Sequence, residues 1–289
     1  MPLKTLTALL TQQVDPPSIP AAHWPPIIKA ALAHDLAPML YWVVRQADAA
    51  APAHDLESDL WQPVKSTALQ TAARWEMYED TLRQVDTALG DAGIPAVWLK
   101  GGILANTVYP KPWTRPMVDL DVLVPHHLRQ PALQALERSG FQYDPDHLWS
   151  HRDTRGIDNS HHFALQGGMG RAVALELNFW LLSAPHYWMS ASQMAWFHQQ
   201  TRAVDTAAGR FRTLTPEAHL LYLVAHAQLQ HAEHEVTHLH AMDVYLFITR
   251  EAIDWDLLVA QAVAFGWTAA AERSLRRVKQ CFDTPGLDA

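Results

Sequence analysis

The chain has little cysteine, no long apolar run and fewer basic than acidic residues. Cys281 is the only cysteine, so an internal disulfide is excluded, which fits a protein of the reducing cytoplasm. No apolar run reaches the roughly 18 residues that span a bilayer, so we expect no membrane segment. The apolar start at residues 1–10 is soon broken by Gln12, Pro16 and Pro17, so we expect no cleavable signal peptide.

The charge balance bears on possible partners. Lysine and arginine number 22 against 30 aspartates and glutamates, which gives a net charge of −8 with histidine neutral. Surfaces that bind nucleic acid without sequence preference are normally basic, so this class of function is not expected. A bulky RNA is therefore the least favoured of the acceptors considered below.

Both ends of the chain have apolar residues every three or four positions, which predicts helices. The clearest of these helices runs from Leu60 or Pro63 to Leu89, and Gly90 and Gly93 end it. Further helices are predicted at residues 27–46, 103–108 and 127–139, and from about residue 190 onward, where Thr215 is the N-cap of a helix that begins at Pro216.

The middle of the chain contains short runs of β-branched and aliphatic residues, which predict strands at 94–99, 118–124, 163–165 and 172–179. Mixed strands and helices in one segment indicate an α+β fold. We predict a small mixed β-sheet core over residues 86–185, flanked by an N-terminal helical region at 1–85 and a C-terminal helical region at 186–289.

Asp119 and Asp121 lie two residues apart on a predicted strand, so both carboxylates project from the same face. We expect Leu120, Val118 and Val122 to face the core on the other side. Two neighbouring anions in a half-buried strand are costly unless a cation neutralises them. Mg²⁺ prefers such oxygen ligands, so the pair predicts a magnesium or manganese site. The alternative is a solvated strand face that needs no ligand.

The predicted strand before this pair ends at Lys100-Gly101-Gly102, where a helix begins. Backbone N–H groups at such a helix start can bind phosphate, and the Lys100 ammonium can add a positive charge. An ordinary strand-to-helix turn is the alternative. Glu176, on a later predicted strand, is a candidate third carboxylate that either completes the metal site or acts as a general base. A solvent-facing strand residue is the alternative for Glu176.

These motifs together resemble the polymerase-β-type nucleotidyltransferase superfamily, and in particular a bacterial branch with a Leu-Lys-Gly segment. The resemblance covers about residues 80–250. It is carried by Leu99-Lys100-Gly101-Gly102, Tyr109-Pro110, the run from Arg115-Pro116 through Asp119-Leu120-Asp121 to Val124, the segment Ala135–Phe141, the segment Leu175–Trp180, and Leu214-Thr215-Pro216-Glu217 with His226, His231 and Asp243. Asn178 departs from the branch, where histidine commonly stands at this position.

The resemblance implies a nucleotidyltransferase core in which Asp119, Asp121 and Glu176 hold the metal ion. The donor would be a nucleoside triphosphate with magnesium, with ATP the expected nucleotide. An acceptor would attack the α-phosphorus and release pyrophosphate, and the acceptor is expected to be a small molecule or a protein. Arg115 would hold a phosphate or position the acids, and a loop ion pair is the alternative reading of Arg115.

A second motif, His234-Glu235-Val236-Thr237-His238, has the H-E-x-x-H pattern of zinc metalloproteases. On a helix, His234 and His238 would share a face and Glu235 would be the base. The local abundance of histidine weakens this pattern, because residues 226–240 contain five histidines. A suitably spaced third ligand is also missing. A partly exposed helix with a histidine stripe is one alternative, and an adventitious metal site is another.

The sequence thus leaves three readings of function. The first is an active nucleotidyltransferase, favoured because Lys100, Asp119, Asp121 and Glu176 are all present. The second is a non-catalytic module of the same fold that binds a nucleotide or a partner. The third is a zinc hydrolase that uses His234, Glu235 and His238.

Overall fold

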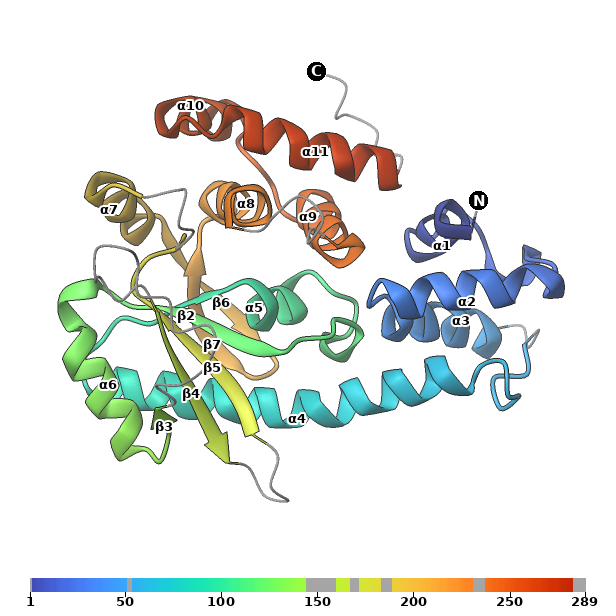
Figure 1. Cartoon of the computed structure of the whole chain (residues 1–289), viewed down its shortest axis with the longest axis horizontal. Coiled ribbons are helices and arrows are strands. Elements are labelled where there is room, and N and C mark those ends of the chain that lie inside the picture. Colours follow the sequence, from blue (N-terminus) through green and yellow to red (C-terminus); the bar gives the residue numbers. More distant parts are fainter. Residues whose placement is uncertain are drawn as a thin grey trace.

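The computed structural model describes residues 2–50, 54–143, 160–166, 172–182, 189–230 and 237–282, with only the backbone described at 50, 143, 160–166 and 172. The strands of these residues form a seven-stranded sheet, which has helices around it and lies to one side of the N-terminal helices (Figure 1). The α+β fold predicted from the sequence is confirmed.

The N-terminal part is helical and contains α1 (Pro2–Leu10), α2 (Trp24–Ala33), α3 (Ala37–Ala50) and the 30-residue helix α4 (Gln62–Asp91). The single helix predicted at 27–46 is wrong, because Asp35 adopts a left-handed φ of 59° between α2 and α3 and an α-helix cannot continue through it. The end of α4 is as predicted: Gly93 has a φ of 69°, and the Ile94 amide donates back to the carbonyl of Leu89.

The sheet has the strand order β3-β4-β5-β2-β1-β7-β6. The strands are β1 (Val97–Leu99), β2 (Asp119–Leu123), β3 (Gln142–Tyr143), β4 (Ser160–Gln166), β5 (Ala172–Asn178), β6 (Thr201–Thr206) and β7 (Gly209–Leu214). The pairs β2–β5 and β1–β7 are parallel and the other pairs are antiparallel, so the sheet is mixed.

The hairpin of β6 and β7 corrects the prediction that the chain is helical from about residue 190. Residues 201–214 form two paired strands, and Trp98 of β1 lies beside Thr213 of β7 in parallel register. Most side chains of β6 are at least partly exposed, because this strand lies at the sheet edge. An edge strand needs few apolar residues, so its sequence gives a weak strand signal. The sheet therefore extends beyond the predicted core range of 86–185.

Short helices connect and cover the sheet. They are α5 (Lys100–Thr107), α6 (Arg129–Arg138), α7 (Ala191–Gln199) and the 3-10 turns at Pro112–Thr114 and His126–Leu128. Two further 3-10 turns, at Pro16–Ser18 and Ala21–His23, lie between α1 and α2. The helix α4 runs along one face of the sheet and contacts α6 and β5 (Figure 1). Leu120 and Val122 of β2 are fully buried in the apolar cluster that includes α4 and α6.

The C-terminal part begins with α8 (Pro216–Ala225), which continues into a π-helical turn at His226–Gln230. The predicted start at Pro216 is confirmed, with Thr215 at the N-cap, although the Thr215 side chain makes no capping hydrogen bond. Then follow α9 (His238–Arg250), α10 (Trp255–Phe265) and α11 (Thr268–Phe282). These helices and α1–α3 share one apolar cluster, which also takes in Val97, Leu99 and Leu123 from the sheet.

Within the described ranges, no helix is both long enough and apolar enough to cross a membrane.

Candidate functional site

The site starts from the pairing of β2 and β5. These strands are parallel, and Asp121 lies opposite Glu176 in their register. Side chains at i and i+2 of a strand share a face, so Asp119 joins them. One carboxylate oxygen from each of the three residues lies within 4.8 Å of the others. Asp121 is buried, whereas Asp119 and Glu176 are half-buried. The fold therefore brings together the three acids that the sequence singled out.

The other face of β2 is apolar, as predicted, with one exception. Leu120 and Val122 are fully buried, but Val118 is 80% exposed. The prediction for Val118 is wrong because β2 begins only at Asp119. The alternation of faces holds only within a strand, so it does not extend to the residue before it.

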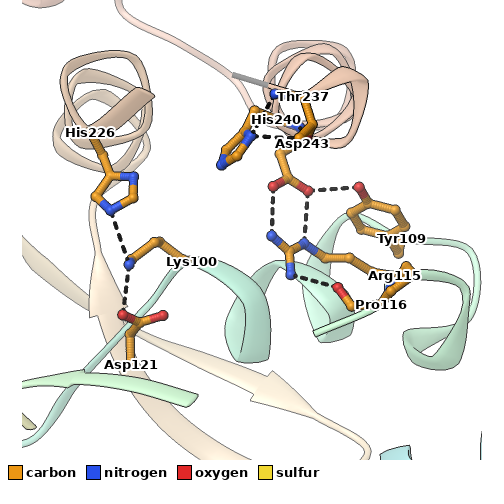
Figure 2. Close-up of polar contacts among 9 residues, drawn as sticks. All are labelled: Lys100, Tyr109, Arg115, Pro116, Asp121, His226, Thr237, His240 and Asp243. Atoms are coloured by element: carbon orange, nitrogen blue, oxygen red, sulfur yellow. Dashed lines mark hydrogen bonds and ion pairs between the residues drawn. The ribbon is translucent and has the colours of Figure 1, made fainter. Parts of the chain in front are cut away.

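Lys100 lies directly over the acidic group. Its Nζ is 2.7 Å from Oδ1 of Asp121 and 3.1 Å from Nε2 of His226, so it bridges the sheet and the π-helical turn after α8 (Figure 2). Lys100 is the first residue of α5 and has a φ of 38°, which is unusual for a residue with a side chain. Strained backbone of this kind persists where the surrounding structure holds it, and it is common at functional sites.

The electrostatics of the site follow from burial and crowding of charge. Burial acts to lower the pKa of Lys100, but Asp121, Tyr222, Glu176 and Asp119 together hold this pKa well above its ordinary value. Burial and the neighbouring Asp121 carboxylate raise the pKa of Asp119 to about 6, although Lys100 opposes this. The three carboxylates therefore carry more negative charge than the single positive charge of Lys100 can neutralise.

Gly101 and Gly102 are required by close packing. A Cβ on Gly101 would lie 2.6 Å from Nη1 of Arg115 and 2.8 Å from Sδ of Met117. A Cβ on Gly102 would lie 2.9 Å from a methyl carbon of Leu120. These residues form the first turn of α5, where no side chain caps the helix. The two glycines therefore allow the start of α5 to pack closely on β2 and on the residues before this strand.

Arg115 is bound to α9. Its Nε and Nη2 donate to the two carboxylate oxygens of Asp243 at 2.8 and 2.7 Å, and Tyr109 donates its hydroxyl proton to Asp243 at 2.6 Å (Figure 2). Arg115 and Asp243 are both buried. Burial acts to lower the pKa of Arg115, but Asp243 outweighs it and holds this pKa above its ordinary value. The fork of the guanidinium therefore pairs with Asp243, and its third nitrogen faces Pro116 and Gly101.

One side chain of α8, Tyr222, and one of the π-helical turn after it, His226, complete the site, and reasoning from the sequence assigned neither of them a role. Tyr222 and His226 are buried, four residues apart, on the helix face toward Lys100. Burial raises the pKa of Tyr222, which Lys100 partly offsets. His226 also begins a π-helical turn, a feature frequent at functional sites. The spacing of Tyr222 and His226 was visible in the sequence, but nothing local indicated that this face meets Lys100.

Asn178 ends β5, two residues after Glu176. It is buried, and its Nδ2 donates to the Glu176 carbonyl at 3.2 Å. This contact is to the backbone, so Asn178 supports the strand that carries Glu176.

The histidine motif lies mostly outside the described residues, which include His238 but not His234 or Glu235. The His238 ring lies against His34 of the loop after α2, with 4.2 Å between ring centroids. Burial, followed by His34 and Arg277, lowers the pKa of His238 to about 4. His238 therefore contacts the N-terminal helices.

The three acids suit a hard divalent cation. All three offer oxygen ligands, which Mg²⁺ and Mn²⁺ prefer over the nitrogen and sulfur ligands typical of zinc. Oδ1 of Asp121 is buried, and among the described residues it accepts no well-aligned hydrogen bond, although Lys100 contacts it as an ion pair. A buried oxygen with free acceptor capacity is what a metal ion requires.

Comparison with solved structures found weak likenesses of fold. An antigenic nucleotidyltransferase-like protein from Paracoccidioides brasiliensis matches with a TM-score of 0.46 and 11% identity, over 70% of this chain and 87% of that one. The antibiotic-resistance factor ANT(2'')-Ia matches with a TM-score of 0.46 and 14% identity, over 70% and 98%. The same protein in complex with adenylyl-2''-tobramycin matches with a TM-score of 0.44 and 14% identity, over 65% and 95%.

Comparison with families is more direct. No curated protein matches the chain. A sequence model of one family, described as uncharacterised nucleotidyltransferase, matches residues 20–283, which is most of the chain. The matched range contains all three acids, Lys100 and the Arg115–Asp243 pair. The chain belongs to this nucleotidyltransferase family.

Proposed function

We propose that this protein is an active enzyme that transfers a nucleotidyl group from a magnesium-bound nucleoside triphosphate to an acceptor hydroxyl. The observation that carries the proposal is the convergence of Asp119, Asp121 and Glu176 within 4.8 Å, with Lys100 in contact. A surface anion cluster would not need a buried member or a lysine on it. Such an arrangement is suited to a cation and a polyphosphate together.

The reaction would proceed by displacement at phosphorus. The acceptor oxygen forms a bond to the α-phosphorus, the bond from that phosphorus to the oxygen bridging the β-phosphorus breaks, and pyrophosphate leaves. The acceptor proton passes to a base, for which Glu176 is the candidate if it does not ligate metal. The divalent cation, when bound, would neutralise charge on the phosphates and on the attacking oxygen.

The residues around the acids would orient the donor. The amides of Gly101 and Gly102, at the start of α5 where no side chain caps the helix, would donate hydrogen bonds to phosphate oxygens. Arg115 would position this turn through its contact with Gly101 and Asp243, instead of binding phosphate with its fork. We take ATP as the donor and a small molecule or a protein as the acceptor, since the net charge of −8 disfavours RNA.

The proposal is tested by calorimetric titration with ATP, GTP, CTP and UTP, with and without Mg²⁺. Magnesium-dependent binding of one nucleotide to the wild type, and its loss in Asp119→Asn and Asp121→Asn, is the expected result. Asp205→Asn is the matched control, because Asp205 is an exposed carboxylate on β6 far along the sheet from β2.

Transfer itself needs a second assay. With nucleotide labelled at the α-phosphate, an active enzyme would release pyrophosphate and move the label onto an acceptor from a panel of small molecules and proteins. Nucleotide binding without transfer to any acceptor of the panel would favour the non-catalytic module of the same fold. Failure of all four nucleotides to bind would contradict the proposal.

A further inference from the structure

In this structure the Lys100 ammonium contacts the acidic group, whereas a lysine that only bound phosphate would not need this contact. The ammonium contacts Oδ1 of Asp121, the buried oxygen with free acceptor capacity that a metal ion would need. The ammonium is also close enough to Glu176 and Asp119 for both to raise its pKa. All three candidate metal ligands therefore act on one lysine.

The Lys100 ammonium and a divalent cation cannot both contact these three carboxylates without strong repulsion between the two positive charges. Mg²⁺ and Mn²⁺ require carboxylate oxygens at about 2.0–2.2 Å in near-octahedral geometry. An ammonium in contact with the same oxygen would lie a few ångströms from the metal, where like charges repel strongly in a partly buried site. One of the two cations must move.

Lys100 is able to move because of where it is attached. It has a flexible four-carbon side chain and is the first residue of α5, beside the amides of Gly101 and Gly102. Besides Asp121, its ammonium contacts Nε2 of His226 at 3.1 Å and the Tyr222 hydroxyl, and neither of these two groups is a carboxylate. Rotation of the side chain toward the start of α5 would place the ammonium where phosphate is expected.

Resting on the function proposed above, we infer that Lys100 is an internal counter-ion of the acidic group, displaced by the metal ion and transferred to the nucleotide phosphates. The lysine would then couple the two ligands. Binding of the metal ion would release the Lys100 ammonium from Asp121 so that it can bind phosphate. Binding of phosphate would in turn move the ammonium away from Asp121. Metal alone would bind weakly, and metal with triphosphate would bind well.

The inference is tested by titrating Mn²⁺ alone and following free Mn²⁺ by electron paramagnetic resonance, a readout independent of activity. Lys100→Met keeps an unbranched side chain of nearly the same length and removes the charge. We expect it to bind Mn²⁺ about tenfold more tightly than the wild type, because a competing cation is gone. Lys29→Met, which removes an exposed charge on α2, is the matched control and should not change the affinity.

A second titration uses a non-hydrolysable ATP analogue at saturating Mn²⁺. Here Lys100→Met should bind about tenfold more weakly, since the transferred ammonium is missing. If Lys100→Met proves unstable, Lys100→Gln gives the same comparison with a polar side chain. Opposite changes in the two affinities support the inference.

The other outcomes separate this inference from the function on which it rests. Equal or weaker Mn²⁺ binding in Lys100→Met, with binding in the wild type, overturns the counter-ion role and leaves the proposed function standing. Tighter Mn²⁺ binding with unchanged affinity for the analogue overturns the transfer to phosphate. Absence of Mn²⁺ binding to both proteins when Mn²⁺ is titrated alone overturns the counter-ion role. Absence of Mn²⁺-dependent binding of the analogue to both proteins overturns the proposed function as well.

Discussion

Asp119 lies where burial and a second carboxylate act together on one side chain. Its pKa is raised to about 6, first by burial and then by Asp121. An aspartate in an unfolded chain has a pKa of about 3.9. Between these two values the folded protein holds a proton that the unfolded chain has lost. The free energy of unfolding therefore falls as pH rises from about 4 to about 6, and the loss persists above that range.

Asp119→Asn should remove this loss. Without divalent cations, we expect the unfolding free energy of the variant, relative to that of the wild type, to rise by about 2 kcal/mol between pH 4.5 and pH 6.5. Urea unfolding in a chelating buffer across pH 4.5–7.5 measures the difference, with Asp205→Asn as the exposed control. A fall in this relative free energy over the same pH range would show that Asp119 is stabilised as an anion.

At the scale of the element, the first turn of α5 is the most constrained segment of the site. It joins the strained Lys100 to two glycines packed on β2 and on the loop before it. The neighbours of Gly101 are the Arg115 guanidinium and the Met117 side chain, and the guanidinium is fixed by Asp243. A side chain at position 101 would thus displace either the helix or the ion pair.

Gly101→Ala should therefore destabilise the protein by about 1–3 kcal/mol and weaken nucleotide binding, because overpacking shifts the phosphate-binding amides. Gly90→Ala is the matched control, since a Cβ at this position of α4 meets nothing within 4 Å. Gly90→Ala should raise the free energy of unfolding by about 0.5–1 kcal/mol, because alanine is more favourable than glycine inside a helix. Thermal melts and nucleotide titration of both variants compare them. Similar stabilities for Gly101→Ala and Gly90→Ala would contradict the close packing of Gly101 against its neighbours.

At the scale of the whole molecule, the Arg115–Asp243 pair links the loop before β2 to α9, 128 residues later in the chain. Tyr109, from the segment after α5, adds a third contact to the same carboxylate (Figure 2). Both charges are buried, and a buried ion pair contributes little net stability against an apolar replacement. Loss of one partner is different, because it leaves the other charge unpaired.

Asp243→Asn should cost about 3–5 kcal/mol, since it leaves the buried Arg115 without its counter-charge. Glu272→Gln is the matched control: it breaks the exposed pair with Arg276 on α11 and should cost less than about 1 kcal/mol. Urea unfolding, followed by circular dichroism and by tryptophan fluorescence, measures both variants. A cost below about 1 kcal/mol for Asp243→Asn would mean that this pair does not hold α9 to the core.

Local features of the sequence determined a good part of the fold and of the site. The alternation around Asp119 and Asp121 placed both acids on one face of β2, because strand periodicity is a property of a few neighbouring residues. The end of α4 at Gly93 and the start of α8 at Pro216 were also predictable, since capping chemistry acts within one turn. The family resemblance drawn from these motifs agrees with the matched family.

Only the tertiary structure decided which side chains contact these residues. The order of the strands places β5 beside β2, which brings Glu176 to Asp121. It also gives Lys100 its contacts with Asp121 and His226, and it pairs Arg115 with Asp243. Strand order and helix docking depend on the burial of apolar faces across the whole chain, so no local spacing could specify these contacts.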